Sequence, residues 1–423
     1  MEQKSTIHKK RIHKHEKTME YILSALKCYK NKDFNKLNDL LYNVRTNDLR
    51  EMLPELGNNH RYFRVIVQII GNEALSMCHG EALYNLAVIL GYKDNVLPLI
   101  NEGALDQVIK CVESKDKRIL HNTVWCLFGF SASSPETRQI CLTKGVLRIS
   151  INILISETDK IQDIAGQVVY GIFHMKPLPS DELSIALFEN GPDLLHIANQ
   201  ALKYVLWSLH FASVDKPDIL IRYGIVEHLL PLLKSNQINI LIPLLIIIGS
   251  LFRTGSNTIN ECINDLRLPL NHTDIKVRLQ ACRTIADFIN DENSVSNTIS
   301  SGLYTDIIRI SKDDDPTVRQ QAVYAILRGF GLGNQDLRRE LANIGGLKSV
   351  LDYCIVASFP FNCNLLDCLN SLIEFDYDFV VPFLRQLDSV SILYQLLSET
   401  EQSVSSKTAN LIGLIGDTYK KSN

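Results

Sequence analysis

Apolar residues recur along this chain with the period of about 3.6 residues that marks an amphipathic helix, and short polar segments separate the apolar stretches. Signals for β-strands are poor throughout, so the pattern predicts an all-α fold. The longest apolar run, residues 238–252, is interrupted by Asn239 and Pro243 and is shorter than the roughly 20 residues of a membrane span. We therefore expect a buried helix there.

Glycine interrupts these predicted helices at recurring places. A motif in which glycine follows a polar or basic pair occurs at residues 101–105, 143–147, 189–194, 222–226, 300–304 and 343–347. A strongly apolar helix is predicted upstream of each motif, and an amphipathic helix follows most of them. Because glycine accepts a positive φ and a closely packed turn, we expect these glycines to separate pairs of helices.

The apolar helices upstream of the glycines align on one column of positions. These positions are Tyr84, Trp125, Val168, Trp207, Arg283 and Tyr324, and extension by the same interval adds Ile246 and Asp367. The steps between the eight positions, in chain order, are 41, 43, 39, 39, 37, 41 and 43 residues. Armadillo and HEAT units are about 40–47 residues long. The spacing therefore predicts a right-handed armadillo-repeat superhelix, an α-solenoid of about nine to ten repeats in which each repeat packs on its neighbours.

This spacing divides the chain into three regions. Residues 1–18 are a short basic tail that we expect to be disordered. Residues 19–60 supply N-terminal capping helices, and residues 61–423 form the armadillo-repeat array.

Composition and motifs narrow the function classes. The net charge of −3 argues against general binding of nucleic acid or a membrane surface, which usually needs a basic domain. The ten cysteines lie in apolar segments without C-x-x-C or zinc-site spacing, as expected for reduced core thiols of an intracellular protein. The sequence has no phosphate-binding loop, metalloprotease motif or nucleophile-elbow motif. We therefore expect a protein that is not an enzyme and uses no metal or cofactor.

The aligned helices resemble those of importin-α (karyopherin-α), the armadillo adaptor family that carries nuclear-localisation peptides. The inner helix of that family reads W-A-L-S/G-N, and VWCLFGFSA at residues 124–132 keeps the tryptophan. Residues 203–237 look like the family's fourth such repeat, and HMKPLPSDE at 174–182 is similar to the place of its proline-rich extension. The resemblance implies a concave groove in which aromatic rings grip an extended peptide, with a protein or peptide cargo as partner.

The chain departs from this family at the residues that clamp the peptide backbone. The family mostly carries an asparagine four residues after each column position. The corresponding residues here are Val88, Gly129, Ile172, Phe211, Ser250, Asp287, Arg328 and Ser371, and none is asparagine. The acidic residue with which the family meets its key lysine would fall near Ser133 and is also missing. We interpret the chain as a divergent relative that lacks the groove asparagines.

The candidate groove combines column residues with residues at the asparagine positions. We assign to it Tyr84, Trp125, Gly129, Trp207, Phe211, Ser250, Arg283, Asp287, Tyr324 and Arg328. The alternative for the aromatic residues is that they fill the seams between repeats, and the alternative for Arg283 is a pair with Asp287 at i,i+4. If the two arginines instead face a ligand, the C-terminal half of the groove accepts an acidic or mixed peptide, because like charges repel.

Two functions remain open from the sequence. The first is an adaptor in nuclear protein import with altered cargo choice, present in both cytoplasm and nucleus. Its basic tail would bind an importin-β-type receptor through Lys9, Lys10, Arg11, Lys14 and Lys17, although such a tail can also be simply solvated or a localisation tag. The second is an armadillo scaffold without a transport role, which binds an acidic or mixed-charge segment of its partner.

Overall fold

The computed structural model describes residues 2–46, 49, 60–255, 257–313, 315–397 and 401–416. Within these ranges every regular element is a helix, which confirms the all-α prediction. The chain divides into two compact units, Met1–Asp215 and Lys216–Asn423, where the sequence predicted one array over residues 61–423. Repeats of a solenoid contact only their neighbours, so a long array has no single core that would prevent such a division.

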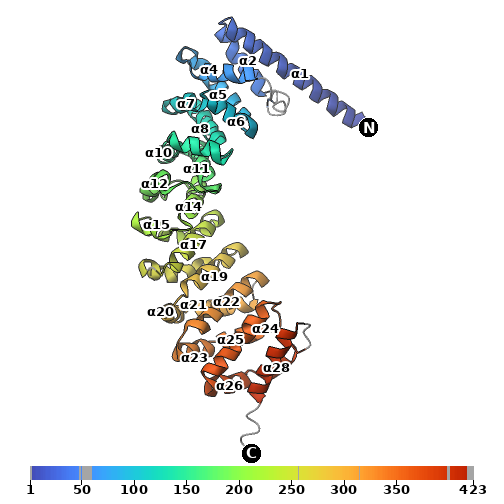
Figure 1. Cartoon of the computed structure of the whole chain (residues 1–423), viewed down its shortest axis with the longest axis vertical. Helices are drawn as coiled ribbons and strands as arrows, with labels where there is room; N and C mark the ends of the chain where they lie inside the picture. Colours follow the sequence, from blue (N-terminus) through green and yellow to red (C-terminus); the bar gives the residue numbers. More distant parts are fainter. Residues whose placement is uncertain are drawn as a thin grey trace, which may run out of the picture. The chain divides into compact units, whose positions relative to one another are not determined.

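The first unit is a stack of long helices with shorter helices beside them (Figure 1). The α5, α8, α11 and α14 helices are those that the sequence alignment picked out, and each packs on the next, with α2 packed on α5. The helices are α1 (Glu2–Lys30), α2 (Phe34–Thr46), α4 (His60–Ile70), α5 (Ser76–Leu90), α6 (Lys93–Asn101), α7 (Ala104–Lys110), α8 (Lys117–Ser131), α9 (Pro135–Thr143), α10 (Val146–Ser156), α11 (Asp159–His174), α12 (Asp181–Glu189), α13 (Gly191–Leu194) and α14 (Asn199–Ser213), with 3₁₀ turns at Glu73–Leu75 and Cys111–Glu113.

The second unit repeats this arrangement. Here α17 packs on α19, α19 on α22, α22 on α25 and α25 on α28. The helices are α15 (Asp218–Arg222), α16 (Val226–Leu229), α17 (Ile238–Arg253), α18 (Arg267–Leu270), α19 (Ile275–Phe288), α20 (Glu292–Ser300), α21 (Leu303–Asp313), α22 (Pro316–Leu332), α23 (Gln335–Asn343), α24 (Gly346–Cys354), α25 (Phe361–Phe375), α26 (Tyr377–Gln386), α27 (Ser389–Tyr394) and α28 (Gln402–Gly416), with 3₁₀ helices at Leu230–Lys234 and Asn257–Leu266.

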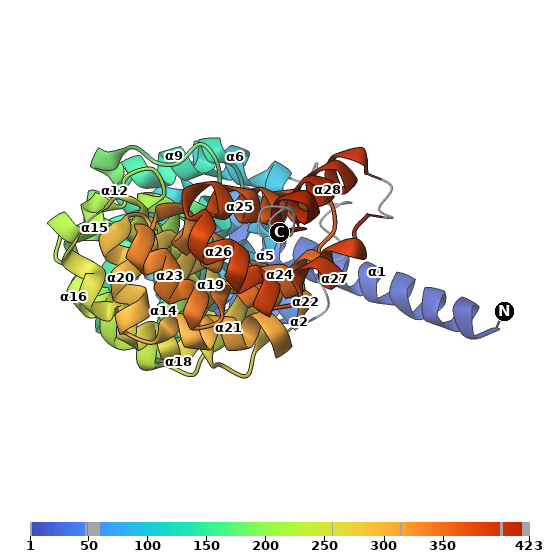
Figure 2. The same cartoon turned by 90° about the horizontal axis from the view of Figure 1, so that it is seen from below.

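The N-terminal segment differs from the sequence prediction. We expected a disordered tail over residues 1–18, but residues 2–18 form the first part of α1. This segment is rich in Glu, Gln, Lys and Arg and contains no Gly or Pro. Such straight-chain residues have high helix propensity, so the helix that packs on α2 continues through them. In both views the N-terminal end of α1 extends beyond the helices beside it (Figure 1, Figure 2).

The glycine motif marks turns between helices, as the sequence predicted. Gly103 and Gly145 have φ values of 85° and 77° and immediately precede α7 and α10. Gly224, Gly302 and Gly345 also have positive φ. The motif at residues 189–194 differs, because Gly191 begins α13 and is not among the glycines with positive φ.

The apolar run at residues 238–252 lies in α17 and is mostly buried, which confirms the predicted core helix. Within the described ranges no single helix has the length and apolar composition to cross a membrane. The neighbouring helices Pro135–Thr143 and Val146–Ser156 reach that length and composition only when they are taken together, and the chain bends by 74° between them. All ten cysteines are free thiols, and eight are buried. Burial raises the pKa of both Cys141 and Cys262 to about 12, so these thiols are poor nucleophiles near neutral pH.

Candidate functional site

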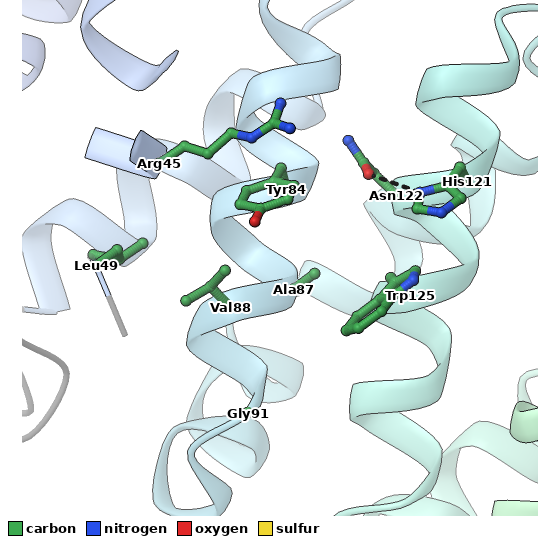
Figure 3. Close-up of a pocket in the computed structure, with 9 residues that line it drawn as sticks. All are labelled: Arg45, Leu49, Tyr84, Ala87, Val88, Gly91, His121, Asn122 and Trp125. Atoms are coloured by element: carbon green, nitrogen blue, oxygen red, sulfur yellow. Dashed lines mark hydrogen bonds between the residues drawn. The ribbon is translucent and has the colours of Figure 1, made fainter. Parts of the chain in front are cut away.

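Tyr84 on α5 and Trp125 on α8 line one pocket in the first unit. Trp125 is 48% exposed, which places its ring on the surface of the stack and not in the seam between two repeats. The pocket has a volume of about 430 Å³, within the range of roughly 300–1,000 Å³ that is typical of ligand sites. Figure 3 shows Ala87 between the two aromatic residues, with Val88 beside Tyr84 on α5.

Gly129, one turn after Trp125, is required by the packing of α5 against α8. A Cβ at this position would lie 2.7 Å from the Cβ of Leu90, which is far inside a normal carbon contact. The missing asparagine at this repeat therefore has a structural reason, because any side chain on Gly129 would displace Leu90. The residue belongs to the helix contact as well as to the partly exposed side of α8.

The polar end of the pocket is formed by residues that the sequence alignment missed. The side chain of Asn122 is buried, and its Nδ2 donates to the carbonyl of Gly80 at 2.8 Å. His121 Nδ1 lies 3.2 Å from Asn122 Oδ1. Asn122 precedes Trp125 by three residues and so lies on the same side of the helix, and this spacing is the signal that could have found it.

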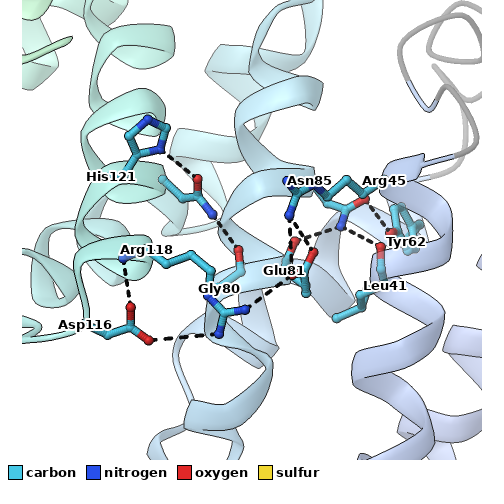
Figure 4. A network of polar contacts seen from close by, with 10 residues as sticks. Leu41, Arg45, Tyr62, Gly80, Glu81, Asn85, Asp116, Arg118 and His121 are labelled. Atoms are coloured by element: carbon cyan, nitrogen blue, oxygen red, sulfur yellow. Dashed lines mark hydrogen bonds and ion pairs between the residues drawn. The ribbon is translucent and has the colours of Figure 1, made fainter. Parts of the chain in front are cut away.

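A network around buried Glu81 connects this pocket to α2 (Figure 4). The Glu81 carboxylate accepts from Arg45 Nη1 at 3.4 Å and lies 3.7 Å from Arg118 Nη1. The guanidinium of Arg45 also lies on the ring of Tyr84, 4.1 Å from its centroid. Asn85 Nδ2 donates to the carbonyl of Leu41 at 3.2 Å and so joins α5 to α2. These contacts join residues 36 to 44 positions apart in the sequence.

The hollow continues across the stack in the first unit. A second pocket of about 1020 Å³ shares Arg45, Tyr84, His121 and Asn122 with the first. It extends to the first turn of α11, at Asp159–Asp163, and to Gln200 on α14. The four inner helices that follow α2 thus share one concave region.

An aromatic cluster lies on α11 and α14. Trp207 stacks on Phe211 with ring centroids 5.8 Å apart, and Tyr170 lies 6.1 Å from Phe211 and 5.9 Å from Tyr204. Phe211 is one of the eight positions at which the sequence comparison looked for an asparagine, and it carries an aromatic ring. The side chains of Tyr170, Trp207 and Phe211 are half-buried.

The column residue on α11 is not part of this cluster. Val168 is fully buried, whereas Tyr170, two positions further along the helix, lies in the cluster. Successive residues of an α-helix are about 100° apart around its axis, so side chains two positions apart point to nearly opposite sides.

Arg138 holds the end of α11 and the loop that follows it. The residue is 2% exposed, and it donates to the carbonyl of Met175 at 2.6 Å and to that of Pro177 at 2.5 Å. Burial lowers the pKa of its guanidinium. A cation at a helix C-terminus satisfies carbonyls that have no partner in the helix. Arg138 therefore fixes the helix end that carries His174 of the aromatic cluster.

The candidate residues of the second unit are arranged differently from the prediction. Asp287 pairs with Arg253 at 2.5 Å and not with Arg283, because Arg253 reaches it from the adjacent α17 helix. Burial raises the pKa of Asp287, and the charge of Arg253 opposes this rise. Ser250 is buried and donates to the carbonyl of Ile246 at 3.0 Å, so it belongs to the helix contact and not to an open groove.

Two other candidates in the second unit are surface residues, and one is a helix cap. Arg283 and Tyr324 are exposed. Arg328 is half-buried, and its Nε donates to the carbonyl of Ile289 at 2.7 Å, directly after the end of α19. The guanidinium of Arg328 therefore caps that helix.

The basic tail is described only in part. The side chains of Lys9, Lys10, Arg11 and Lys14 lie outside the described part of the chain. Lys17 is exposed, with its Nζ 6.0 Å from the ring centroid of Tyr21. Across the residues that the structure covers, no group of three or more His, Cys, Asp or Glu side chains is placed to hold a metal ion.

Comparison with known proteins supports the fold more than the function. No protein-family model matches the chain. The chain is 26% identical over 216 residues to importin subunit alpha-1b of Oryza sativa subsp. japonica, a match that covers 48% of this chain and only 40% of the rice protein. A crystal structure of an engineered protein is similar with a TM-score of 0.72 at 16% identity, covering 93% of this chain and 98% of that one. The chain therefore has an armadillo- or HEAT-like helical-repeat fold, with a distant sequence similarity to an importin-α.

Proposed function

We propose that this chain is a non-enzymatic, protein-binding repeat scaffold that holds an extended peptide segment on its first unit. The binding surface is the aromatic face, which we define as Tyr84, Trp125, Tyr170, Trp207 and Phe211. The observation that carries the proposal is the exposure of Trp125, 48%, at a concave pocket. Large aromatic side chains in such pockets commonly supply most of the binding energy at protein interfaces.

The two tryptophans of the chain give a direct test of this surface. Both lie on the aromatic face, so tryptophan fluorescence, excited apart from that of the tyrosines, reports only on this region. A peptide selected from a random display library on the full chain should change the tryptophan emission and bind at least tenfold more weakly to Trp125→Ala and Trp207→Ala. Tyr394→Ala, a change at an exposed aromatic residue of the second unit, is the control. Equal affinity for all variants would show that the peptide binds elsewhere.

We further propose that the scaffold acts as an adaptor in nuclear protein import, with a cargo choice that differs from that of importin-α. The similarity to a rice importin subunit alpha and the basic residues of α1 support this role. Such an adaptor would be present in both cytoplasm and nucleus. The second candidate is a scaffold without transport, which binds an acidic or mixed-charge segment. The loss of asparagine at all eight aligned positions favours this second role.

Binding of a purified importin-β-type receptor distinguishes the two roles. The full chain should be compared with a variant in which Lys9, Lys10, Arg11, Lys14 and Lys17 are changed to Gln. A matched control changes Lys27 and Lys30 of the same helix. Binding that is lost only in the five-residue variant supports the adaptor, whereas no binding by the wild-type chain supports the scaffold without transport.

A further inference from the structure

The pocket between α5 and α8 has an apolar end and a polar end. Figure 3 shows Arg45, Asn122 and His121 at the upper end, and Leu49, Val88 and Trp125 below them. Among the described residues that line it, Arg45 is the one with a full charge. The pocket thus combines apolar walls with a single positive group, and no described carboxylate lines it.

Arg45 is held in place and keeps donors for a ligand. Its Nη1 is bound by Glu81, whose side chain is 5% exposed, while the side chain of Arg45 is 34% exposed. Within the described part of the chain, the hydrogen bonds of Arg45 use Nη1 alone, and its Nε and Nη2 have no described acceptor. Arg118, the second cation on Glu81, lines the larger hollow but not this pocket. A buried carboxylate between two arginines therefore fixes one guanidinium at the pocket.

The chain's own cations also occupy the ring faces that a lysine of a ligand would need. The guanidinium of Arg45 lies 4.1 Å from the ring centroid of Tyr84. On α14, Lys203 Nζ lies 4.6 Å from the ring centroid of Tyr204. A cation–π contact uses the ring face, and a second cation at that face would meet a like charge. The face of each ring that these cations cover is therefore poorly suited to a lysine from a peptide.

We propose that this pocket binds a bulky apolar side chain, such as Phe or Leu, in an extended peptide in which the second residue after it is Asp or Glu. Side chains two positions apart lie on the same side of an extended chain. The apolar side chain lies against Trp125, Ala87 and Val88, and the acidic side chain accepts from Arg45. The proposal rests on peptide binding by the aromatic face and adds the chemistry of the preferred ligand. Charge complementarity selects the acidic residue, because a guanidinium binds a carboxylate through two parallel donors.

Fluorescence polarisation with three labelled nine-residue Gly-Ser peptides tests this preference on the full chain. Their centres read Phe-Ser-Glu, Phe-Ser-Lys or Ala-Ser-Glu, and the peptides are named Phe-Glu, Phe-Lys and Ala-Glu after the two residues that vary. The Phe-Glu peptide should bind at least tenfold more tightly than either of the others. Arg45→Gln should remove the preference for Glu over Lys, and Arg45→Lys should keep part of it. Arg64→Gln, a change at a 65% exposed arginine of the same unit that does not line the pocket, is the matched control.

The outcomes separate this proposal from the proposed function. Tighter binding of Phe-Lys than of Phe-Glu, lost in Trp125→Ala, would overturn the acidic preference and leave peptide binding at this face intact. A preference for Phe-Glu that persists unchanged in Arg45→Gln would also overturn it. If none of the three peptides binds while library-selected peptides still change the tryptophan emission, the pocket chemistry is wrong and the binding surface is right. Circular dichroism of each variant identifies loss of binding by unfolding.

Discussion

Gly129→Ala separates two opposing effects where α5 packs against α8. Exchange of glycine for alanine inside a helix ordinarily stabilises the helix by about 1 kcal/mol. Here the added Cβ would lie 2.7 Å from Leu90 Cβ and 3.3 Å from Leu90 Cδ1, whereas carbon atoms pack best at about 3.5–4.0 Å. Overpacking of this kind costs about 1–3 kcal/mol. The expected net change is a loss of about 0–2 kcal/mol in the free energy of unfolding, in place of the usual gain.

Hydrogen exchange followed by mass spectrometry measures this change locally, which suits a repeat protein whose parts can open separately. Gly413→Ala on α28 is the control, because a Cβ there meets no atom within 4 Å. It should gain protection while Gly129→Ala does not. Leu90→Gly combined with Gly129→Ala should cost less than the sum of the single changes, since glycine lacks the Cβ that the added methyl group would meet. Equal gains for both glycine changes, or additive effects at 90 and 129, would refute the packing explanation.

Three further changes test the polar contacts. Arg138→Met leaves the carbonyls of Met175 and Pro177 without their buried donor, and should lower the free energy of unfolding by about 1–3 kcal/mol in urea denaturation; an undiminished value would contradict the capping role. Glu81→Gln removes the charge shared by Arg45 and Arg118, and should cost about 1–3 kcal/mol by the same measurement. Because burial raises the pKa of Asp287 above its ordinary value of 3.8, the protonated form is favoured in the folded state, and the contribution of this residue to stability should fall as pH rises from 3.8 through the raised pKa. Asp287→Asn should remove that fall, and an identical pH profile for the two proteins would contradict it.

The sequence predicts the helices and their turns well because these depend on local order. Apolar periodicity identified α5, α8, α11 and α14, and the recurring glycine motif identified turns such as Gly103 and Gly145. The first part of α1 shows the limit of this reasoning, since a basic composition was taken to indicate disorder. Helix propensity and the absence of Gly and Pro favour a helix there in spite of the charge.

The candidate site was predicted only in part, because it depends on contacts between distant segments. Trp125 was identified by its place in the repeat. Gly129 is explained by its contact with Leu90, which lies 39 positions earlier in the chain, and no local sequence pattern indicates such a contact. The partner of Asp287 is likewise on the preceding inner helix, where an i,i+4 pair with Arg283 seemed the local alternative. Tyr170 was not predicted because it lies two positions from the column residue Val168, on nearly the opposite side of the helix. Arg45 was missed because it belongs to α2, outside the aligned column.

Photocrosslinking from position 125 tests the central claim, peptide binding by the aromatic face, most directly. A photoreactive phenylalanine analogue replaces Trp125 in the full chain, and the library-selected peptide is added at increasing concentration. The account predicts saturable crosslinking that excess unlabelled peptide prevents, with little crosslinking from the same analogue at Tyr92, which is 37% exposed and does not line the pocket. Equal crosslinking from both positions, or none from position 125 while the peptide remains bound, would contradict it.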